Sequence, residues 1–280
     1  MQLEANHHKA ITQIRLAASR GAVLAVLPEY HLLNWVPKDP GFKAACSHWE
    51  TYLTNYRDLA KALKINIVPG TIIELHGAGT PGERLLNVAY FIDSTGAVAG
   101  RYVKKNLWGA IERDHLTSSA REEHPVFDTP LGKVGMLICW DLAFPEAWRE
   151  LIAQGAKMVI IPTFWTLSDC SEKGLKVNPR AEALFLDSVL VARTFENTCG
   201  ELTMDLTRFG LEVSVWLTGA IVQLLFLPML VDRRIKATLD FHRSACLTLG
   251  RWRNWGTARR GWRWRMLICR SWRMRRRIIR

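Results

Sequence analysis

The sequence predicts a single domain of the α/β class, and two observations indicate this. Short apolar runs of strand length alternate with segments in which apolar residues recur at helical spacing, as far as Cys199. A hydrophobic fraction of 49% in 280 residues is enough for a sizeable core. Runs such as the one between Gly132 and Ile138 have no polar alternation, which is typical of strands covered on both faces.

The predicted elements alternate along the chain. Helices are expected over 6–19, 49–63, 147–155 and 181–197, because apolar residues recur there every three or four positions. Buried strands are expected over 21–29, 65–73, 134–138 and 157–165. Two further strands, over 85–93 and 97–103, form a hairpin that turns at Ser94-Thr-Gly96.

One cysteine, Cys139, lies where a predicted strand turns into a predicted helix. The strand runs from Val134 to Ile138, and Pro145 is typical of a first helical turn. Unpaired N–H groups at such a turn favour the thiolate, which is the nucleophilic form of cysteine. A buried cysteine that packs as a small hydrophobic side chain is the alternative.

Charged residues end two other predicted strands. Glu29 follows the apolar run that starts at Gly21, and Lys104 and Lys105 follow the second strand of the hairpin. A carboxylate, an ammonium and a thiol at three strand ends can converge at one edge of a sheet. Because side chains alternate along a strand, Lys104 and Lys105 are expected to point to opposite faces.

The contexts of these three residues resemble the Glu-Lys-Cys motifs of the nitrilase, or carbon–nitrogen hydrolase, superfamily. The matching motifs are Leu-Pro-Glu29, Tyr102-x-Lys104-x-x-Leu107, and Cys139-Trp-Asp followed by Phe144-Pro-Glu146. They occur in the family's order and spacing, and the resemblance covers roughly residues 1–199.

The resemblance implies a four-layer α-β-β-α sandwich and a thiol hydrolase of small nitriles or amides. Cys139 would be the nucleophile, Glu29 the general base and Lys104 the cation that stabilises the developing negative charge. Glu112 matches a second glutamate of the family, with a surface glutamate as the alternative, and Trp140 and Trp165 are expected beside the substrate. The resemblance implies a homo-oligomer, and neither a metal nor an organic cofactor.

Cysteine usage and the start of the chain bear on the compartment. The six cysteines include no CxxC pair or Cys/His cluster, so neither a zinc site nor a disulfide framework is indicated. A reducing, cytoplasmic location fits best, and the first residues do not resemble a secretory signal. In the family a strand precedes the first helix, and this sequence begins after it, so the fold is expected to be incomplete at its start.

The chain changes character after Cys199. The net charge of +12 comes from residues 251–280, which hold twelve arginines and no acidic residue. The nineteen residues from Val213 to Val231 carry no charge and are typical of a membrane span. A membrane-anchored or nucleic-acid-binding protein is therefore the alternative function, in which Arg and Trp would contact headgroups, phosphates or bases.

We expect instead that residues 200–280 are a translated intron followed by a shifted reading frame, with no domain, membrane or nucleic-acid role. Read in the shifted frame, 223–235 can encode the Asn-Ala-Gly-Gly turn that the family places after this point, and 263–280 can encode an acidic ending. Codons for Cys199 to Leu202 can contain a splice donor, and those for Val222 and Gln223 an acceptor. The fold is then expected to be incomplete at its end too.

Overall fold

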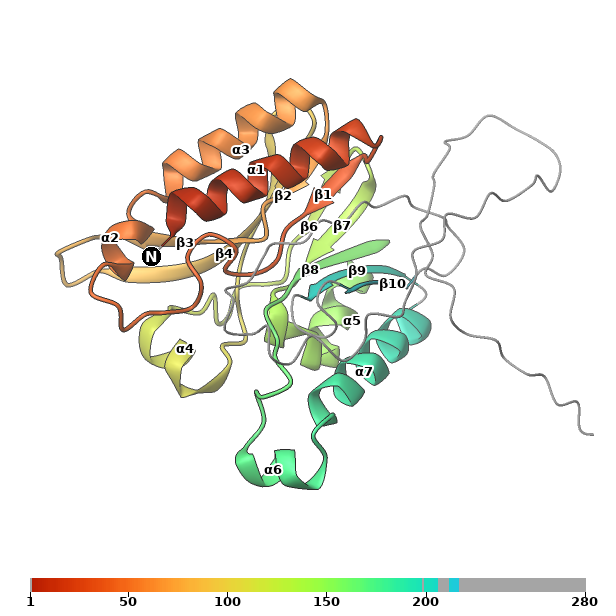
Figure 1. The fold of residues 1–280 in the computed structure, drawn as a ribbon. Helices are drawn as coiled ribbons and strands as arrows, with labels where there is room; N and C mark the ends of the chain where they lie inside the picture. Colours follow the sequence, from red (N-terminus) through yellow and green to blue (C-terminus); the bar gives the residue numbers. More distant parts are fainter. Residues whose placement is uncertain (1, 198, 206–211, 217–280) are drawn as a thin grey trace, which may run out of the picture.

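The computed structural model describes residues 2–197, 199–205 and 212–216. Two five-stranded sheets lie in the middle of the molecule, and helices cover their outer faces (Figure 1). The helices on the first sheet are α1 (Leu3–Ser19) and α3 (Trp49–Leu63), and those on the second are α5 (Pro145–Ala153) and α7 (Ala181–Asn197). This arrangement confirms the α/β class and the four-layer α-β-β-α sandwich.

The first sheet contains the two strands that lead to Glu29 and Lys104. Its order is β1-β2-β4-β3, and β5 pairs with β4. β1 and β2 are parallel, whereas β4 is antiparallel to β2, β3 and β5. The bounds are β1 Leu24–Val26, β2 Asn66–Val68, β3 Thr71–His76, β4 Arg84–Ile92 and β5 Val98–Val103.

The second sheet contains the strands that lead to Cys139 and to Phe164. Its order is β10-β9-β8-β7-β6, with β7, β8 and β9 parallel to one another. The bounds are β6 Val126–Thr129, β7 Gly132–Met136, β8 Met158–Pro162, β9 Gly200–Asp205 and β10 Glu212–Trp216. We had not expected a strand directly after Cys199. The sheet continues past that position, and the domain boundary there stays a prediction.

Four short helical segments lie in stretches where the sequence analysis expected no helix. They are α2 Phe42–Cys46, η1 Cys139–Ala143, α4 Gly109–His115 and α6 Glu172–Val177. Segments of this length carry too little of a helical repeat to be found by periodicity. Two of them matter for the site, because η1 begins at Cys139 and α4 carries Glu112.

The apolar residues form two layers of core. In one, α1 buries Ala10, Ile14 and Ala17 between itself, α3 and the outer face of the first sheet. The other includes residues of both sheets together with the fully buried Trp148 of α5 and Leu186 of α7. The two sheets are thereby fixed against each other, which holds the strand ends in register.

Four strand ends meet at one edge of this sandwich. β1 leads to Glu29, β5 to Lys104, β7 to Cys139 and β8 to Phe164. β1 runs parallel to β2, and β5 and β2 are both antiparallel to β4, so β1 and β5 point the same way. The parallel pairing of β7 and β8 likewise aligns their carboxyl ends.

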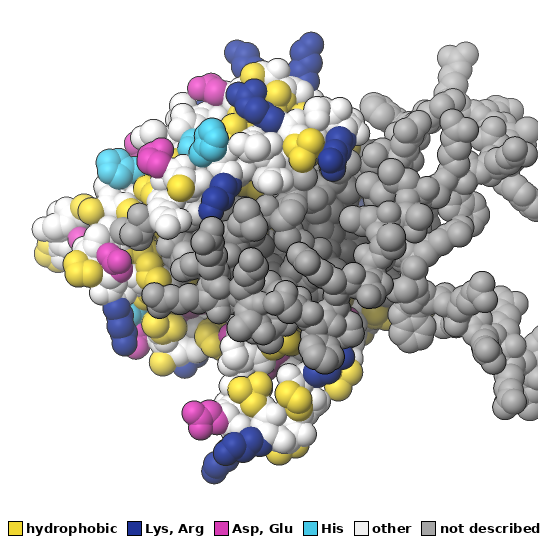
Figure 2. Space-filling model, viewed as in Figure 1, with side chains coloured by type: hydrophobic (Ala, Val, Ile, Leu, Met, Phe, Trp, Pro, Cys, Tyr) yellow, Lys and Arg dark blue, Asp and Glu magenta, His cyan; other side chains and the backbone are white. Residues whose placement is uncertain are grey.

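Much of the predicted tail lies outside the described residues. Val213 to Trp216 belong to β10, whereas 217–231 and the Arg/Trp-rich segment 251–280 are not described. Within the described part of the chain, no helix combines the length and apolar character that crossing a bilayer requires. On the face shown in Figure 2, basic and acidic side chains of the described residues are interspersed.

Candidate active site

Cys139 occupies a strained position at the first residue of η1, shortly after the end of β7. Its φ is 47°, in the left-handed region that side chains other than glycine rarely adopt. The Ile138 backbone N–H donates to Asp141 Oδ2 at 3.0 Å, which tightens the turn. The thiol is buried and donates to the Phe164 carbonyl at 3.4 Å. The turn therefore directs Cys139 toward the strand end that follows β8.

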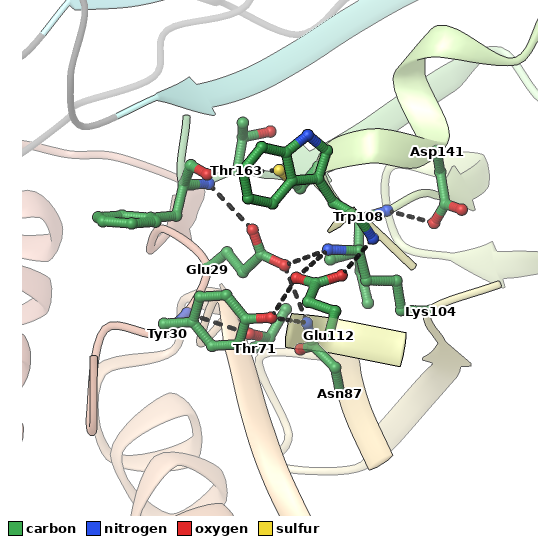
Figure 3. Close-up of polar contacts among 12 residues, drawn as sticks. Glu29, Tyr30, Thr71, Asn87, Lys104, Trp108, Glu112, Asp141 and Thr163 are labelled. Carbon is green, nitrogen blue, oxygen red and sulfur yellow. Dashed lines mark hydrogen bonds and ion pairs between the residues drawn. The ribbon is translucent and has the colours of Figure 1, made fainter. Parts of the chain in front are cut away.

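Lys104 bridges two buried carboxylates. Its Nζ lies 2.9 Å from Glu29 Oε1 and 2.8 Å from Glu112 Oε1 (Figure 3). The lysine side chain is 0% exposed, so the ion pairs are removed from water. Burial of a charge requires this kind of pairing.

Further donors form hydrogen bonds to the oxygens of the two carboxylates. Asn87 Nδ2 donates to Glu29 Oε1 at 2.8 Å, and the Phe164 backbone N–H donates to Glu29 Oε2 at 3.1 Å. Glu112 receives the Tyr30 hydroxyl at 2.5 Å on Oε1 and the Trp108 backbone N–H at 2.7 Å on Oε2. Figure 3 shows these side chains converging on the space around Lys104.

Asp141 joins the lysine-bearing segment to the cysteine turn. It is fully buried and accepts the Tyr102 hydroxyl on Oδ2 at 2.8 Å, next to its bond from the Ile138 N–H. Its Oδ1 accepts both the backbone N–H and the side-chain amide of Asn106, each at 2.8 Å. One carboxylate thus fixes the residues on either side of Lys104 relative to Cys139.

Comparison with known proteins identifies the family. The carbon-nitrogen hydrolase family model matches residues 1–199, which include all of these site residues. The chain belongs to the carbon–nitrogen hydrolase family.

Individual members of the family agree with this assignment. The chain is 31% identical over 144 residues to a probable nitrilase of Schizosaccharomyces pombe, and the match covers 50% of this chain and 44% of that protein. It is 28% identical over 159 residues to the deaminated glutathione amidase of Mus musculus, covering 54% of this chain and 49% of the relative. The chain therefore spans less than half the length of these two relatives.

A solved structure supports the fold. Saccharomyces cerevisiae Nit3, a member of the nitrilase superfamily, superposes with a TM-score of 0.61 at 24% identity. The superposition covers 73% of this chain and 70% of that one. At this identity the likeness establishes the nitrilase-type fold of the chain.

The electrostatics of the site act against the effect of the turn. Burial raises the pKa of the Cys139 thiol well above its usual value, and the Glu29 charge raises it further, against the opposing effect of Lys104. The N–H groups of the turn favour the thiolate, but the net shift of the pKa is upward. The thiol is neutral at rest, and it becomes a nucleophile only when a neighbouring base takes its proton.

Glu29 is suited to take that proton. Burial raises its pKa, Lys104 lowers it, and the neighbouring Glu112 raises it again, with a net upward shift. The pKa of Lys104 is also raised: burial alone would lower it, but Glu29, Cys139 and Glu112 more than compensate. The lysine accordingly stays charged while Glu29 has increased affinity for a proton.

The structure brings Glu29, Lys104, Cys139 and Glu112 together, as the sequence analysis expected. Lys105 points away from this group: its Nζ lies 3.3 Å from His124 Nδ1 and 3.8 Å from a Glu150 carboxylate oxygen. The choice of Lys104 over its neighbour therefore agrees with the geometry.

Trp140 and Trp165 lie in an aromatic cluster. Their ring centroids are 5.3 Å apart, and both rings pack on Phe185. The Trp165 indole N–H donates to Glu182 of α7 at 2.7 Å. These contacts support the backbone on which Cys139 and Phe164 are carried, and a substrate contact by either tryptophan stays a prediction.

Tyr30, Asn87 and Asp141 were not predicted from the sequence to belong to the site. A signal existed for Asn87, because it is a single amide within the apolar strand β4. Asp141 lies inside the Cys-Trp-Asp motif, but no role was assigned to it. Nothing local marks Tyr30, whose partner Glu112 is 82 positions away in the sequence.

Proposed function

We propose that the chain hydrolyses a carbon–nitrogen bond of a small nitrile or amide through a covalent intermediate on Cys139. The observation that carries this proposal is the Lys104 ammonium between two buried carboxylates, beside a neutral thiol. This arrangement supplies a nucleophile, a base and an electrophilic stabiliser within one enclosed site.

In the proposed first step, Glu29 accepts the thiol proton as sulfur forms a bond to the nitrile or carbonyl carbon. Negative charge develops on the substrate nitrogen or oxygen, where Lys104 and the backbone N–H of Trp140 stabilise it. Each such donor commonly contributes about 3 kcal/mol to transition-state stabilisation. The nitrile thereby becomes a thioimidate, and the amide a tetrahedral adduct.

The second half of the reaction uses the same groups. Glu29 returns its proton to the substrate nitrogen, and ammonia or an amine leaves from the tetrahedral adduct to give a thioester. With a nitrile, the proton on Glu29 first goes to the thioimidate nitrogen. Glu29 then takes a proton from a water that attacks the thioimidate carbon and passes it to the nitrogen, which gives the same adduct. Water, deprotonated by Glu29, then attacks the thioester carbon and releases the carboxylic acid and the thiol. The steps balance with water as the only co-substrate.

Glu112 has a supporting role in this proposal. It holds Lys104 together with Glu29 and thereby fixes the direction of the ammonium. A lysine held by two carboxylates keeps its charge during catalysis, so it stabilises the oxyanion without donating its proton.

The exposed face of α7 and the cysteines support a proposal on assembly and location. α7 exposes Leu184, Val191 and Phe195, of which Phe195 is 79% exposed, and such an apolar face suits a contact between copies of the chain. Cys46, Cys139 and Cys170 form no disulfide with another described residue, which suits a reducing compartment such as the cytoplasm.

The frameshift hypothesis for 200–280 is tested by sequencing the transcript across codons 195–230. A mature message that keeps the bases between the splice donor and the acceptor, with peptides of the tail abundant in the cell, would contradict it.

The decisive experiment for the reaction is ammonia release from a panel of aliphatic nitriles and amides. It should be run with the full chain, with a chain in which the reading frame after Cys199 is repaired, and with Cys139→Ala as the control. We expect release by at least the repaired chain and none by the Cys139→Ala variant. Equal release by wild type and Cys139→Ala would refute the proposal.

A further inference from the structure

The two carboxylates, the lysine, Tyr30 and Asn87 form a closed ring of hydrogen bonds. Lys104 donates to Glu29 and Glu112, Tyr30 donates to Glu112, and Asn87 donates to both Glu29 and the Tyr30 hydroxyl oxygen. The two Asn87 distances are 2.8 Å to Glu29 Oε1 and 3.1 Å to Tyr30. All five side chains are buried.

The chemistry of the members fixes the direction of every bond in the ring. Lys104 can only donate, and ionised Glu29 and Glu112 can only accept. Asn87 uses both amide hydrogens, one toward Glu29 and one toward Tyr30, so the Tyr30 hydroxyl must turn its own hydrogen to Glu112. Asn87 is therefore the one neutral member that donates to the base.

The backbone of Asn87 places the lysine as well. The Lys104 backbone N–H donates to the Asn87 carbonyl at 2.9 Å, next to the paired residues of β4 and β5. A single residue of β4 thus aligns the base through its side chain and the lysine through its main chain. Its side-chain Oδ1 has no hydrogen-bond partner among the described residues, so the amide is turned with both hydrogens toward the ring.

Glu29 needs this donor because its surroundings are otherwise unfavourable to a second negative charge. Burial and the neighbouring Glu112 both raise its pKa, and only Lys104 and the thiol oppose them strongly. A hydrogen bond from a neutral donor to an ionised, buried carboxylate favours the ionised form. The titratable groups that face Glu29 are Tyr30, Lys104, Glu112 and Cys139.

We propose that Asn87 is a positioning residue that keeps Glu29 ionised and directed toward Cys139. Asn87 is not a catalytic residue, because it acts on the reaction only through Glu29. The inference rests on the proposed roles of Glu29 as base and Cys139 as nucleophile. A purely structural role of Asn87 would leave the proton affinity of Glu29 unchanged.

The test measures alkylation of Cys139 by iodoacetamide as a function of pH in the full chain, with labelled peptides quantified by mass spectrometry. Cys170, which lies partly exposed in the segment before α6, provides an internal reference in every sample. Because Glu29 must be ionised to accept the thiol proton, the midpoint of the acidic limb reports its protonation. The probe needs no knowledge of the substrate.

In Asn87→Leu, we expect that midpoint to rise by about one pH unit, so that alkylation at the wild-type midpoint is about fivefold slower. Tyr30→Phe keeps the hydrogen bond from Asn87 to Glu29 and removes the hydrogen bond from the Tyr30 hydroxyl to Glu112. The midpoint of this variant should therefore not rise. Asn66→Leu is the matched control, because Asn66 is also a buried amide of the first sheet, bonded to Val23 and Ser94.

An unchanged midpoint in Asn87→Leu, or the same rise in Tyr30→Phe or Asn66→Leu, would overturn the inference. If circular dichroism shows that Asn87→Leu does not fold, Asn87→Ala carries the same expectation. Glu29→Gln separates this inference from the proposed function. If its acidic limb equals that of wild type, the base assignment itself fails. If its acidic limb is lost while Asn87→Leu is unchanged, only the role of Asn87 fails.

Discussion

The first sheet carries two buried ionic clusters with different designs. At the site, one fully buried lysine serves two carboxylates, Glu29 and Glu112. On β3, the single carboxylate Glu74 lies 2.6 Å from the Arg101 guanidinium. It also has hydrogen bonds with Tyr90 and His76. We name this second group the Glu74 cluster. Its cation is 42% exposed, whereas Lys104 is 0% exposed.

The ratio of carboxylates to cations differs between the two clusters. The Glu74 cluster is suited to stabilising the sheet, whereas the site is suited to proton transfer. In the Glu74 cluster, one carboxylate meets a partly exposed guanidinium and further donors, so its charge is well compensated. At the site, two carboxylates compete for one ammonium, which leaves excess negative charge beside a thiol. Excess charge in a buried place shifts proton affinities, and such shifts are typical of catalytic groups.

The largest expected effect comes from removing the nucleophile of the site. Cys139→Ala should abolish turnover of any nitrile or amide substrate while the thermal unfolding midpoint stays close to that of wild type, because alanine needs no partner there. Turnover and a melting curve, measured on the same preparation, check this. A variant with full turnover would remove the central difference between the two clusters.

The next effect concerns the charges of the site. Glu29→Gln removes the proton acceptor and Lys104→Ala the oxyanion stabiliser, so each should lower kcat/KM by about a hundredfold or more. Lys105→Ala is the matched control, because this lysine contacts His124 and Glu150 and should retain most of the activity. An inactive Lys105→Ala together with an active Lys104→Ala would invert the assignment.

The pH dependence should also distinguish the site from an ordinary carboxylate. The pKa of Glu29 is raised above its ordinary value of 4.5, so on acidification it takes up a proton at a higher pH than an exposed glutamate. The acidic limb of kcat/KM should therefore have its midpoint above 4.5. The same shift means that ionising Glu29 costs stability as the pH rises from 4.5 through the raised pKa. An acidic limb at or below 4.5 would contradict this.

The smallest effect on activity is expected in the Glu74 cluster. Glu74→Gln weakens its bonds to Arg101 and His76 and should lower the free energy of unfolding by about 2 kcal/mol. Because the hydrogen bonds and ion pairs of Glu74 go to His76, Tyr90 and Arg101, and not to the site, kcat/KM should stay within about twofold of wild type. Tyr90→Phe should have a smaller effect on both quantities. Loss of activity without loss of stability would mean that the two clusters are coupled.

The sequence by itself determined the α/β class and three site residues. Glu29, Lys104 and Cys139 each sit in a local motif at the end of a strand, and the spacing of the resembled motif after Tyr102 selected Lys104 over Lys105. Such features depend on neighbouring residues, so they can be identified without the fold. The motif resemblance added the four-layer architecture and Glu112.

Only the tertiary structure decided how the site is supported and how it titrates. Asn87 reaches Glu29 across 58 positions of sequence, and Asp141 reaches Tyr102 across 39, so no local pattern reveals either pairing. The pKa of Cys139 depends on the fold for the same reason. The N–H groups of its turn are local, but the burial and the Glu29 charge that raise its pKa arise only when two sheets pack face to face.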